Sequence, residues 1–303
     1  MRDPATPLPP AFHEDVRRRL RARAERADLD GLLLLGAGNV TYATGWHFSV
    51  NERPVGLWLP VDGEAALMVP LLEQEVALAV PGVGVRVYEE FPGERPPVLW
   101  MIEQAGAPRI AVDTLGAEHL APARALVARL DLVDYVRPER AVKSEAELAL
   151  SREASRFADL VLERLLEAGG DIIRQGGSEA ELMADCTGHA RAVLTATHGE
   201  AFQGTKVGIT ASVHSGPRGA LPHGAVTHRR PRPGEPIIAG IGCSLGGYHA
   251  ESGVTLVLGE ISAEQRSVME AMAEAGAATL EALALGRRCA EVNEAALGAL
   301  RRA

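Results

Sequence analysis

Apolar and polar residues follow two different periods along the first half of the chain. Residues 14–27 carry Val16, Leu20, Ala24 and Ala27 at helical spacing, which predicts an amphipathic helix. Short apolar runs predict strands at residues 32–35, 56–60, 65–70, 83–88, 109–113 and 132–136. Helical stretches are expected between some of them, at residues 71–80, 97–105 and 118–129. Strands that alternate with helices predict a layered α/β domain.

The pattern changes near residue 138, and we place a domain boundary there, which gives domains of residues 1–138 and 139–303. A long helix is expected from Ser144, because Glu147 three positions later completes a capping box. A Gly-, Pro- and His-rich segment follows at residues 199–234, and strands are expected at residues 236–241 and 249–258. Two helices are expected at the end, one capped by Ser262 and Gln265 and one after Gly286.

Composition and charge narrow the class of protein. The chain has 303 residues, of which 47% are hydrophobic, so it has enough apolar surface to bury a core. Lys and Arg number 31 against 40 acidic residues, and the net charge of −9 argues against nucleic acid or an anionic membrane as the partner. Three scattered cysteines fit a reducing, cytoplasmic compartment. No apolar run approaches the roughly 18 residues that a membrane span needs.

Three motifs suggest chemistry that their context does not support. Residues 17–21 hold four arginines, but on the polar side of an amphipathic helix. Residues 36–38 resemble a dinucleotide-binding loop, yet Thr41 stands where a third glycine is needed. Ser244 lies in a GxSxG sequence, but a nucleophile elbow leads into a helix and needs a later histidine. A strand is expected next, and no histidine follows His249, so a serine hydrolase is disfavoured.

The most informative segment runs from His214 to Glu251. Four of the nine histidines of the chain lie within it, on a backbone rich in Gly and Pro and beside two expected strands. Imidazoles titrate near neutrality, so such a cluster favours a functional pocket with acid and base groups. A tetrahedral zinc site explains it less well, because neither HxxxH nor Cys/His spacing occurs.

Several short motifs in this segment and in the first half share their order with one known family. They are Ser215-Gly216-Pro217, Leu221-Pro222-His223, Pro233-Gly234-Glu235, Gly247-Tyr248, residues 39–46 (NVTYATGW) and Val142-Lys143-Ser144. The chain resembles the pita-bread family of Xaa-Pro dipeptidases, aminopeptidase P, methionine aminopeptidases and creatinase. The resemblance implies an α/β creatinase/prolidase-type N-terminal domain and an α+β pita-bread C-terminal domain that is incomplete, since its last strands are expected beyond residue 303. It also implies a homodimer that acts on a dipeptide or another small molecule.

The resemblance fails at the positions that bind metal in the peptidases. Family members hold two divalent ions with two aspartates eleven residues apart, and Gly240 and Glu251 stand at those positions here. The family's further ligands, a histidine and two glutamates, come from strands expected after residue 303. We therefore predict no metal and no other cofactor for the sequence as it stands. A Mn, Co or Zn pair is expected only if those C-terminal ligands exist.

Creatinase is the metal-free branch of this family, and two positions match it. His223 falls where creatinase has its catalytic histidine. Arg53 falls where an N-terminal-domain arginine grips the substrate carboxylate in the neighbouring subunit, a role that suits the planar guanidinium. The glutamate that holds the guanidinium of creatine would sit at Gly253, so the substrate need not be creatine.

The leading hypothesis is a hydrolase that cleaves a C–N bond of a small amino-acid-derived substrate. His223 is the expected general acid and base, Glu251 its partner or a ligand for a substrate cation, and Tyr248 a donor to the oxyanion. Arg53 and His214 are the expected substrate-binding residues. Two alternatives stay open, namely a metal-dependent Xaa-Pro aminopeptidase or dipeptidase whose C-terminal ligands are missing here, and a homologue that binds without catalysis.

Overall fold

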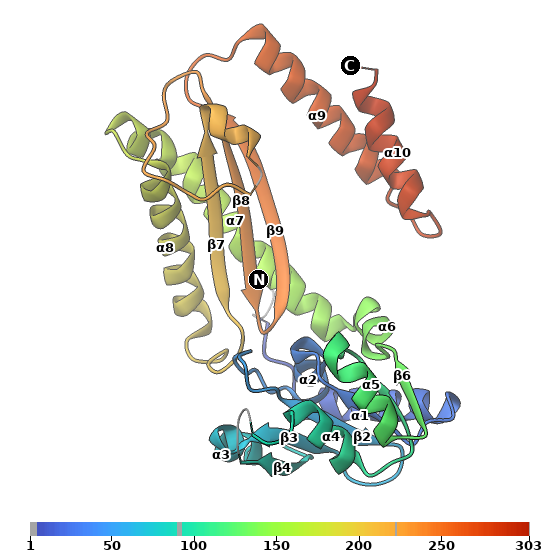
Figure 1. The fold of residues 1–303 in the computed structure, drawn as a ribbon. Helices are drawn as coiled ribbons and strands as arrows, with labels where there is room; N and C mark the ends of the chain where they lie inside the picture. Colours follow the sequence, from blue (N-terminus) through green and yellow to red (C-terminus); the bar gives the residue numbers. More distant parts are fainter. Residues whose placement is uncertain (1–4, 90–92, 222, 303) are drawn as a thin grey trace. The chain divides into compact units, whose positions relative to one another are not determined.

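The computed structural model describes residues 5–89, 93–221 and 223–302, and it divides into two compact units. Figure 1 shows the elements of both units in chain order. The first unit contains the chain up to Phe157, together with Val193–Gly208 and Cys243–Ala250. The second contains Ala158–Ala192, Ile209–Gly242 and the chain from Glu251 onward. Each unit is therefore built from segments that are distant in the sequence.

A six-stranded mixed sheet, in the order β4-β3-β2-β1-β5-β6, forms the centre of the first unit. Strand β1 pairs antiparallel with β2, and β2 pairs antiparallel with β3, whereas the other neighbours are parallel. Gly63 has φ of 111° in the tight turn between β2 and β3, a backbone conformation that favours glycine. The strands are β1 (Gly31–Leu34), β2 (Gly56–Pro60), β3 (Ala66–Pro70), β4 (Gly84–Tyr88), β5 (Arg109–Val112) and β6 (Arg129–Leu132).

Helices cover both faces of this sheet. Leu32 and Leu34 of β1 belong to a core cluster with residues of α1 (Pro10–Arg26) and α2 (Ala37–Thr44). Leu33 belongs to a second cluster with residues of α4 (Pro97–Ala105) and α5 (Ala117–Leu126). Because successive side chains of a strand point to opposite faces, these buried strands read as continuous apolar runs.

The structure corrects the sequence prediction after α5. The strand expected at residues 132–136 is wrong, because β6 occupies Arg129–Leu132 and pairs in parallel with β5. A helix follows instead, α6 (Val136–Ala141). Its first turn is fixed by Asp134, whose Oδ1 accepts the backbone N–H groups of Val136 and Arg137 at 2.9 and 3.0 Å. The single helix expected at residues 71–80 is a short 3₁₀ turn followed by α3 (Gln74–Leu78).

Two long helices and a three-stranded sheet follow the first α/β layer. The helices are α7 (Glu145–Arg174) and α8 (Glu179–His198), and the strands are β7 (Gly208–Ser215), β8 (Pro236–Leu245) and β9 (Tyr248–Val257), in the order β7-β8-β9. Strand β7 lies in the Gly-, Pro- and His-rich segment, where no strand is expected from the sequence. Along β8, Ile237, Ala239 and Ile241 are buried, whereas Gly240 is exposed, so this sheet has one covered face and one open face.

The last two helices, α9 (Ala263–Ala282) and α10 (Cys289–Leu300), pack against each other. The predicted capping box of α9 is confirmed, since Ser262 Oγ accepts the Gln265 N–H at 3.1 Å and Gln265 Oε1 accepts the Ser262 N–H at 2.8 Å. Within the part of the chain that the structure describes, no helix combines the length and apolarity that crossing a membrane requires.

Candidate functional site

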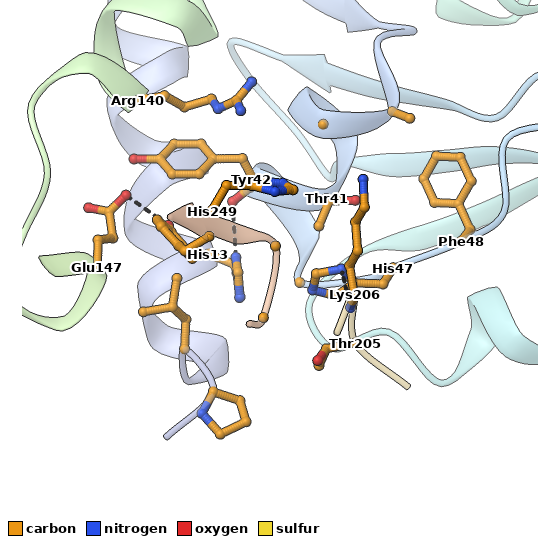
Figure 2. Close-up of a pocket in the computed structure, with 18 of the residues that line it drawn as sticks. His13, Thr41, Tyr42, His47, Phe48, Arg140, Glu147, Thr205, Lys206 and His249 are labelled. Carbon is orange, nitrogen blue, oxygen red and sulfur yellow. Dashed lines mark hydrogen bonds between the residues drawn. The ribbon is translucent and has the colours of Figure 1, made fainter. Parts of the chain in front are cut away.

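A cavity of about 1280 Å³ lies in the first unit, and Figure 2 shows part of its lining. The lining comes from α1, α2 and the loop after α2, from the first turns of α7, and from the residues before β7 and around the β8–β9 turn. Its polar lining includes His13, Tyr42, His47, Asp134, Arg137, Arg140, Lys143, Glu147, Lys206 and Tyr248. His249 lines the same cavity.

Two histidines of the cavity hold defined tautomers. His13 is 8% exposed, and its Nδ1 lies 2.9 Å from the Tyr42 carbonyl oxygen, which can only accept, so Nδ1 carries a proton. His47 Nδ1 accepts the backbone N–H of Lys206 at 3.2 Å, so its proton in the neutral ring is on Nε2. Burial lowers the pKa of both His13 and His47, which keeps both rings neutral near pH 7.

Glu147 is the buried acid of the cavity, with 2% of its surface exposed. Its Oε2 accepts the Ser144 N–H and Oγ–H at 2.7 and 2.8 Å, which confirms the predicted capping box. Its Oε1 accepts the Tyr248 hydroxyl at 2.9 Å, and burial together with this bond raises the pKa of Tyr248. Burial, and then the charge of Glu147, raises the pKa of Tyr42 to about 12. Both tyrosines are therefore neutral at physiological pH.

The charges around the cavity are predominantly positive. Arg137, Arg140, Lys143 and Lys206 are exposed and line it, against two acids, Glu147 and Asp134. Asp134 is occupied by capping α6, as described above. The cavity therefore carries an excess of two positive charges in a chain whose net charge is −9.

The open face of the β7-β8-β9 sheet has a different chemistry. A Cβ atom at Gly240 would lie 3.0 Å from Ser212 Oγ, and one at Gly242 would lie 3.1 Å from Thr210 Oγ1. The two hydroxyls of β7 thus occupy the space above the glycines of β8. Glu251 is exposed on β9, the neighbour of β8. In the second unit this face therefore combines hydroxyl groups with the carboxylate of Glu251.

His214 and His223 lie on the chain that leaves β7. His214 is only 2% exposed, and its Nε2 donates to the Gly224 carbonyl oxygen at 2.6 Å. This bond closes the loop that carries His223, and His223 itself is exposed in a turn. The structure thus gives His214 a contact with the loop backbone and leaves the imidazole of His223 accessible.

Glu179, at the start of α8, fixes both ends of this loop. It is fully buried, and it accepts hydrogen bonds from the N–H and hydroxyl of Ser215 at 2.8 and 2.9 Å and from the Thr227 hydroxyl at 2.8 Å. Arg218 Nε adds an ion pair at 3.2 Å. Ser215 Oγ also accepts from Arg229, which pairs with Glu235 at 2.7 Å. Glu179 was not among the residues predicted from the sequence.

The remaining sequence candidates are placed as follows. Arg53 is in an exposed loop of the first unit, where it pairs with Glu52 and its N–H donates to Asn51 Oδ1 at 2.8 Å. Ser244 lies inside β8, and the chain turns at Gly246 and Gly247 directly into β9. A strand, turn and strand replace the strand and helix of a nucleophile elbow, as the residue pattern predicts.

Tyr248 and Glu251 are not brought together by β9. They are three residues apart in one strand, and side chains at that spacing point to opposite faces. Tyr248 lines the cavity of the first unit, whereas Glu251, His223 and His214 belong to the second unit. The predicted catalytic set therefore divides into a tyrosine bound to Glu147 and a group of residues around the open sheet face.

Two family models together match nearly the whole chain. The creatinase/prolidase N-terminal domain matches residues 17–138, and metallopeptidase family M24 matches residues 149–303, just over half of the chain. The chain belongs to metallopeptidase family M24. The relatives found in this family are dipeptidases and prolidases, in agreement with the pita-bread proteins that the sequence motifs resemble.

Individual relatives agree with this family. The probable dipeptidase PepE of Mycobacterium tuberculosis is 31% identical over 291 residues, which are 93% of this chain and 74% of that protein. The solved structure of dipeptidase PepE from Mycobacterium ulcerans superposes with a TM-score of 0.81 at 25% identity, over 98% of this chain and 78% of that one. A prolidase structure from Thermococcus sibiricus gives 0.78 at 23%, over 96% and 77%. The predicted fold class is confirmed.

The family name implies bound metal ions, and the residues here do not fit a metal pair. Gly240, where the sequence resemblance implies a metal ligand, offers no side chain, and the side-chain groups of β7 that face Gly240 and Gly242 are the hydroxyls of Ser212 and Thr210. Divalent ions prefer several convergent carboxylate oxygens. Across the described residues, no group of three or more His, Cys, Asp or Glu side chains is arranged to hold an ion.

Proposed function

We propose that the chain hydrolyses a C–N bond of a small amino-acid-derived substrate on the open face of β7, β8 and β9, without the family's metal pair. The observation that carries the proposal is Glu251, an exposed carboxylate at a family ligand position, beside a β8 position where Gly240 has no carboxylate. Membership of a peptidase family supports the class of reaction. The hydroxyls of Ser212 and Thr210 give the same face polar groups that bind substrate atoms.

His223 is the proposed general base and acid. Its exposed imidazole takes a proton from the water that attacks the substrate carbon, and the same proton passes to the leaving nitrogen as the C–N bond breaks. Glu251 orients the imidazolium or holds a substrate cation. The bond from His214 to Gly224 and the contacts of Glu179 support this role, because they fix the loop on which His223 is carried.

Other parts of the expected machinery stay predictions. Arg53 is proposed to bind a substrate carboxylate in a homodimer, and His214 to contact substrate as well as the loop. Tyr248 acts on an oxyanion only if its hydroxyl leaves Glu147, so Tyr248→Phe separates a catalytic role from a structural one. The cytoplasmic compartment is likewise proposed from the cysteine content.

The test is an assay of Xaa-Pro dipeptides, creatine and acylated amino acids, with and without manganese. We expect turnover without metal, and a loss of about 10²- to 10⁴-fold in kcat for His223→Ala. His228→Ala is the matched control, because His228 is an exposed histidine of the same segment. Glu251→Gln is expected to lower kcat as well, whereas the exposed Glu274→Gln of α9 is not.

Each alternative outcome has a defined meaning. Unchanged turnover in His223→Ala contradicts the assignment of the general base. Turnover that requires manganese supports the metal-dependent Xaa-Pro peptidase instead. Binding of these compounds with no turnover at all supports a homologue that has kept the fold and lost the chemistry.

A further inference from the structure

We infer that the cavity of the first unit is a binding site for a small organic carboxylate, that is, a single negative charge on an apolar body. The inference does not rest on the proposed function. The lining residues of the cavity include neither His223 nor Glu251, and the test measures binding rather than turnover.

The first argument is unbalanced positive charge. In the described part of the chain, none of Arg137, Arg140, Lys143 and Lys206 forms an ion pair with a carboxylate. Arg140 donates to the Asn39 side-chain oxygen at 3.3 Å, and Lys143 to the Arg140 carbonyl at 3.4 Å, so both keep their full charge for another partner. Figure 2 shows Arg140 on the side of the cavity that holds Tyr42, with Lys206 beside His47 on the other.

A buried hydroxyl without a well-formed hydrogen bond also lines the cavity. The Tyr42 side chain is 7% exposed, and burial and the nearby Glu147 carboxylate raise the pKa of its hydroxyl, yet among the described residues that hydroxyl makes no hydrogen bond of acceptable geometry. A buried polar group without a partner is rare in folded proteins, and it indicates a missing ligand or water. His47 Nε2–H is a further donor, because its Nδ1 is occupied by the Lys206 N–H. A ligand with acceptor oxygens matches both groups.

The other residues that line the cavity favour an anion with a single charge and an apolar body. Leu8, Ala37 and Phe48 give the cavity an apolar component that fits a hydrocarbon body. The buried Glu147 repels negative charge at close range, and the repulsion is twice as large for a dianion as for a monoanion. Arg binds both carboxylate and phosphate with a planar pair of hydrogen bonds, so the repulsion from Glu147 is what favours a singly charged carboxylate over phosphate.

The experiment is calorimetric titration of the whole chain with benzoate and with isovalerate, each compared with its neutral amide and with inorganic phosphate. We expect both carboxylates to bind, and benzamide and isovaleramide to bind at least about tenfold more weakly, since they lack the charge. Binding is expected to weaken as the salt concentration rises, because the four basic groups are exposed.

Variants locate the site. Arg140→Gln and Lys206→Gln are each expected to weaken carboxylate binding about tenfold, and Tyr42→Phe is expected to weaken it by a smaller factor. Arg124→Gln is the matched control, because Arg124 is an exposed arginine of α5 outside the cavity lining. Glu251→Gln tests the open sheet face and is expected to leave binding unchanged. Circular dichroism checks that each variant is folded. If Arg140→Gln is unfolded, Lys206→Gln alone tests the role of the basic side chains.

Several results would overturn the inference. The titrations would do so by showing no binding of either carboxylate, equal binding of acid and amide, or tighter binding of phosphate than of carboxylate. Normal binding by the folded cavity variants would do so as well. Loss of binding in Glu251→Gln alone also overturns it, and places the ligand on the sheet face of the proposed function.

Discussion

Glu179 shows how one buried side chain determines the position of a loop. Burial alone raises the pKa of a carboxyl group, but the hydrogen bonds from Thr227 and Ser215 and the charge of Arg218 outweigh it, and the net shift of the Glu179 pKa is downward. The carboxylate is therefore ionised in the folded chain. Because its donors lie on both sides of His223 in the sequence, the same contacts hold the two ends of the loop together.

Glu179→Gln is expected to lower the free energy of unfolding by about 2–4 kcal/mol, measured by urea denaturation. The amide keeps the size of the side chain, but it loses the charge and turns an NH₂ group toward other donors. Glu200→Gln, which changes an exposed glutamate in the turn after α8, is the control and is expected to change stability by less than about 0.5 kcal/mol.

The difference between wild type and Glu179→Gln is expected to depend on pH. A carboxyl whose folded pKa is lowered contributes its stability above the unfolded value of about 4.5, and loses it as the pH falls through the folded pKa. The two unfolding curves should therefore approach each other in acid. A gap that is equally wide at every pH would show that the amide acts through packing alone.

Only some residues of the candidate site carry a signal in the sequence. Glu147 is recognisable from its capping box with Ser144, and His223 and Glu251 from their place in a histidine-rich segment. His13, Tyr42, His47 and Lys206 come together from distant segments. Tyr42 lies in the NVTYATGW motif, but that motif indicates only the family, and nothing in the local sequence marks the other three. A single sequence does not specify which distant loops meet, and this is why the cavity was not predicted.

At the scale of elements, the pattern of apolar residues predicted most strands of the first sheet. The prediction failed where local hydrogen bonds, and not apolar residues, determine the secondary structure. Residues 132–136 look like a strand by composition, but the Asp134 side chain accepts two backbone N–H groups and starts α6. Strand β7 was missed for a related reason, since the alternation along Gly208–Ser215 is mixed with small polar residues. Its partner β8 supplies the hydrogen bonds that make it a strand.

Two glycine substitutions should act in opposite directions. Gly247 has φ of 83° in the β8–β9 turn, and a Cβ there would lie 3.1 Å from His47 Cε1. Gly247→Ala is therefore expected to destabilise the hairpin by about 1–2 kcal/mol. Gly276 lies inside α9, and a Cβ there meets nothing within 4 Å, so Gly276→Ala is expected to stabilise that helix by about 0.5–1 kcal/mol.

Amide hydrogen exchange measures both effects where they occur. Faster exchange in β8 and β9 is expected for Gly247→Ala, and slower exchange in α9 for Gly276→Ala. Each variant serves as the control for the other, because the same chemical change is made in a turn and in a helix. Slower exchange in both variants would contradict the positive φ of Gly247.

At the scale of the whole molecule, net charge and local charge point to different ligands. The value of −9 excludes a general attraction to polyanions, yet four basic side chains gather around one cavity. The net charge argues against nucleic acid as a partner. The local attraction of a small anion cannot be read from that sum, because it depends on which charges the fold brings next to one another.

Removal of metal tests whether the stability of the whole folded chain depends on a bound ion. An ion bound only by the folded state stabilises it by about 2.7 kcal/mol when its concentration is one hundred times its Kd. We expect the chain, purified with manganese and then dialysed, to hold well under one ion per molecule by elemental analysis. Addition of EDTA is expected to leave the unfolding midpoint unchanged.

The matched control for metal removal restores the missing carboxylate. Gly240→Asp combined with Ser212→Ala places an acid on β8 and removes the hydroxyl that a Cβ would approach at 3.0 Å. This double variant is expected to bind manganese more tightly than the wild type, because Glu251 then has a second carboxylate on the neighbouring strand. Stoichiometric manganese in the wild type, or an EDTA-sensitive midpoint, would mean that Glu251 and ligands other than residue 240 already form a metal site.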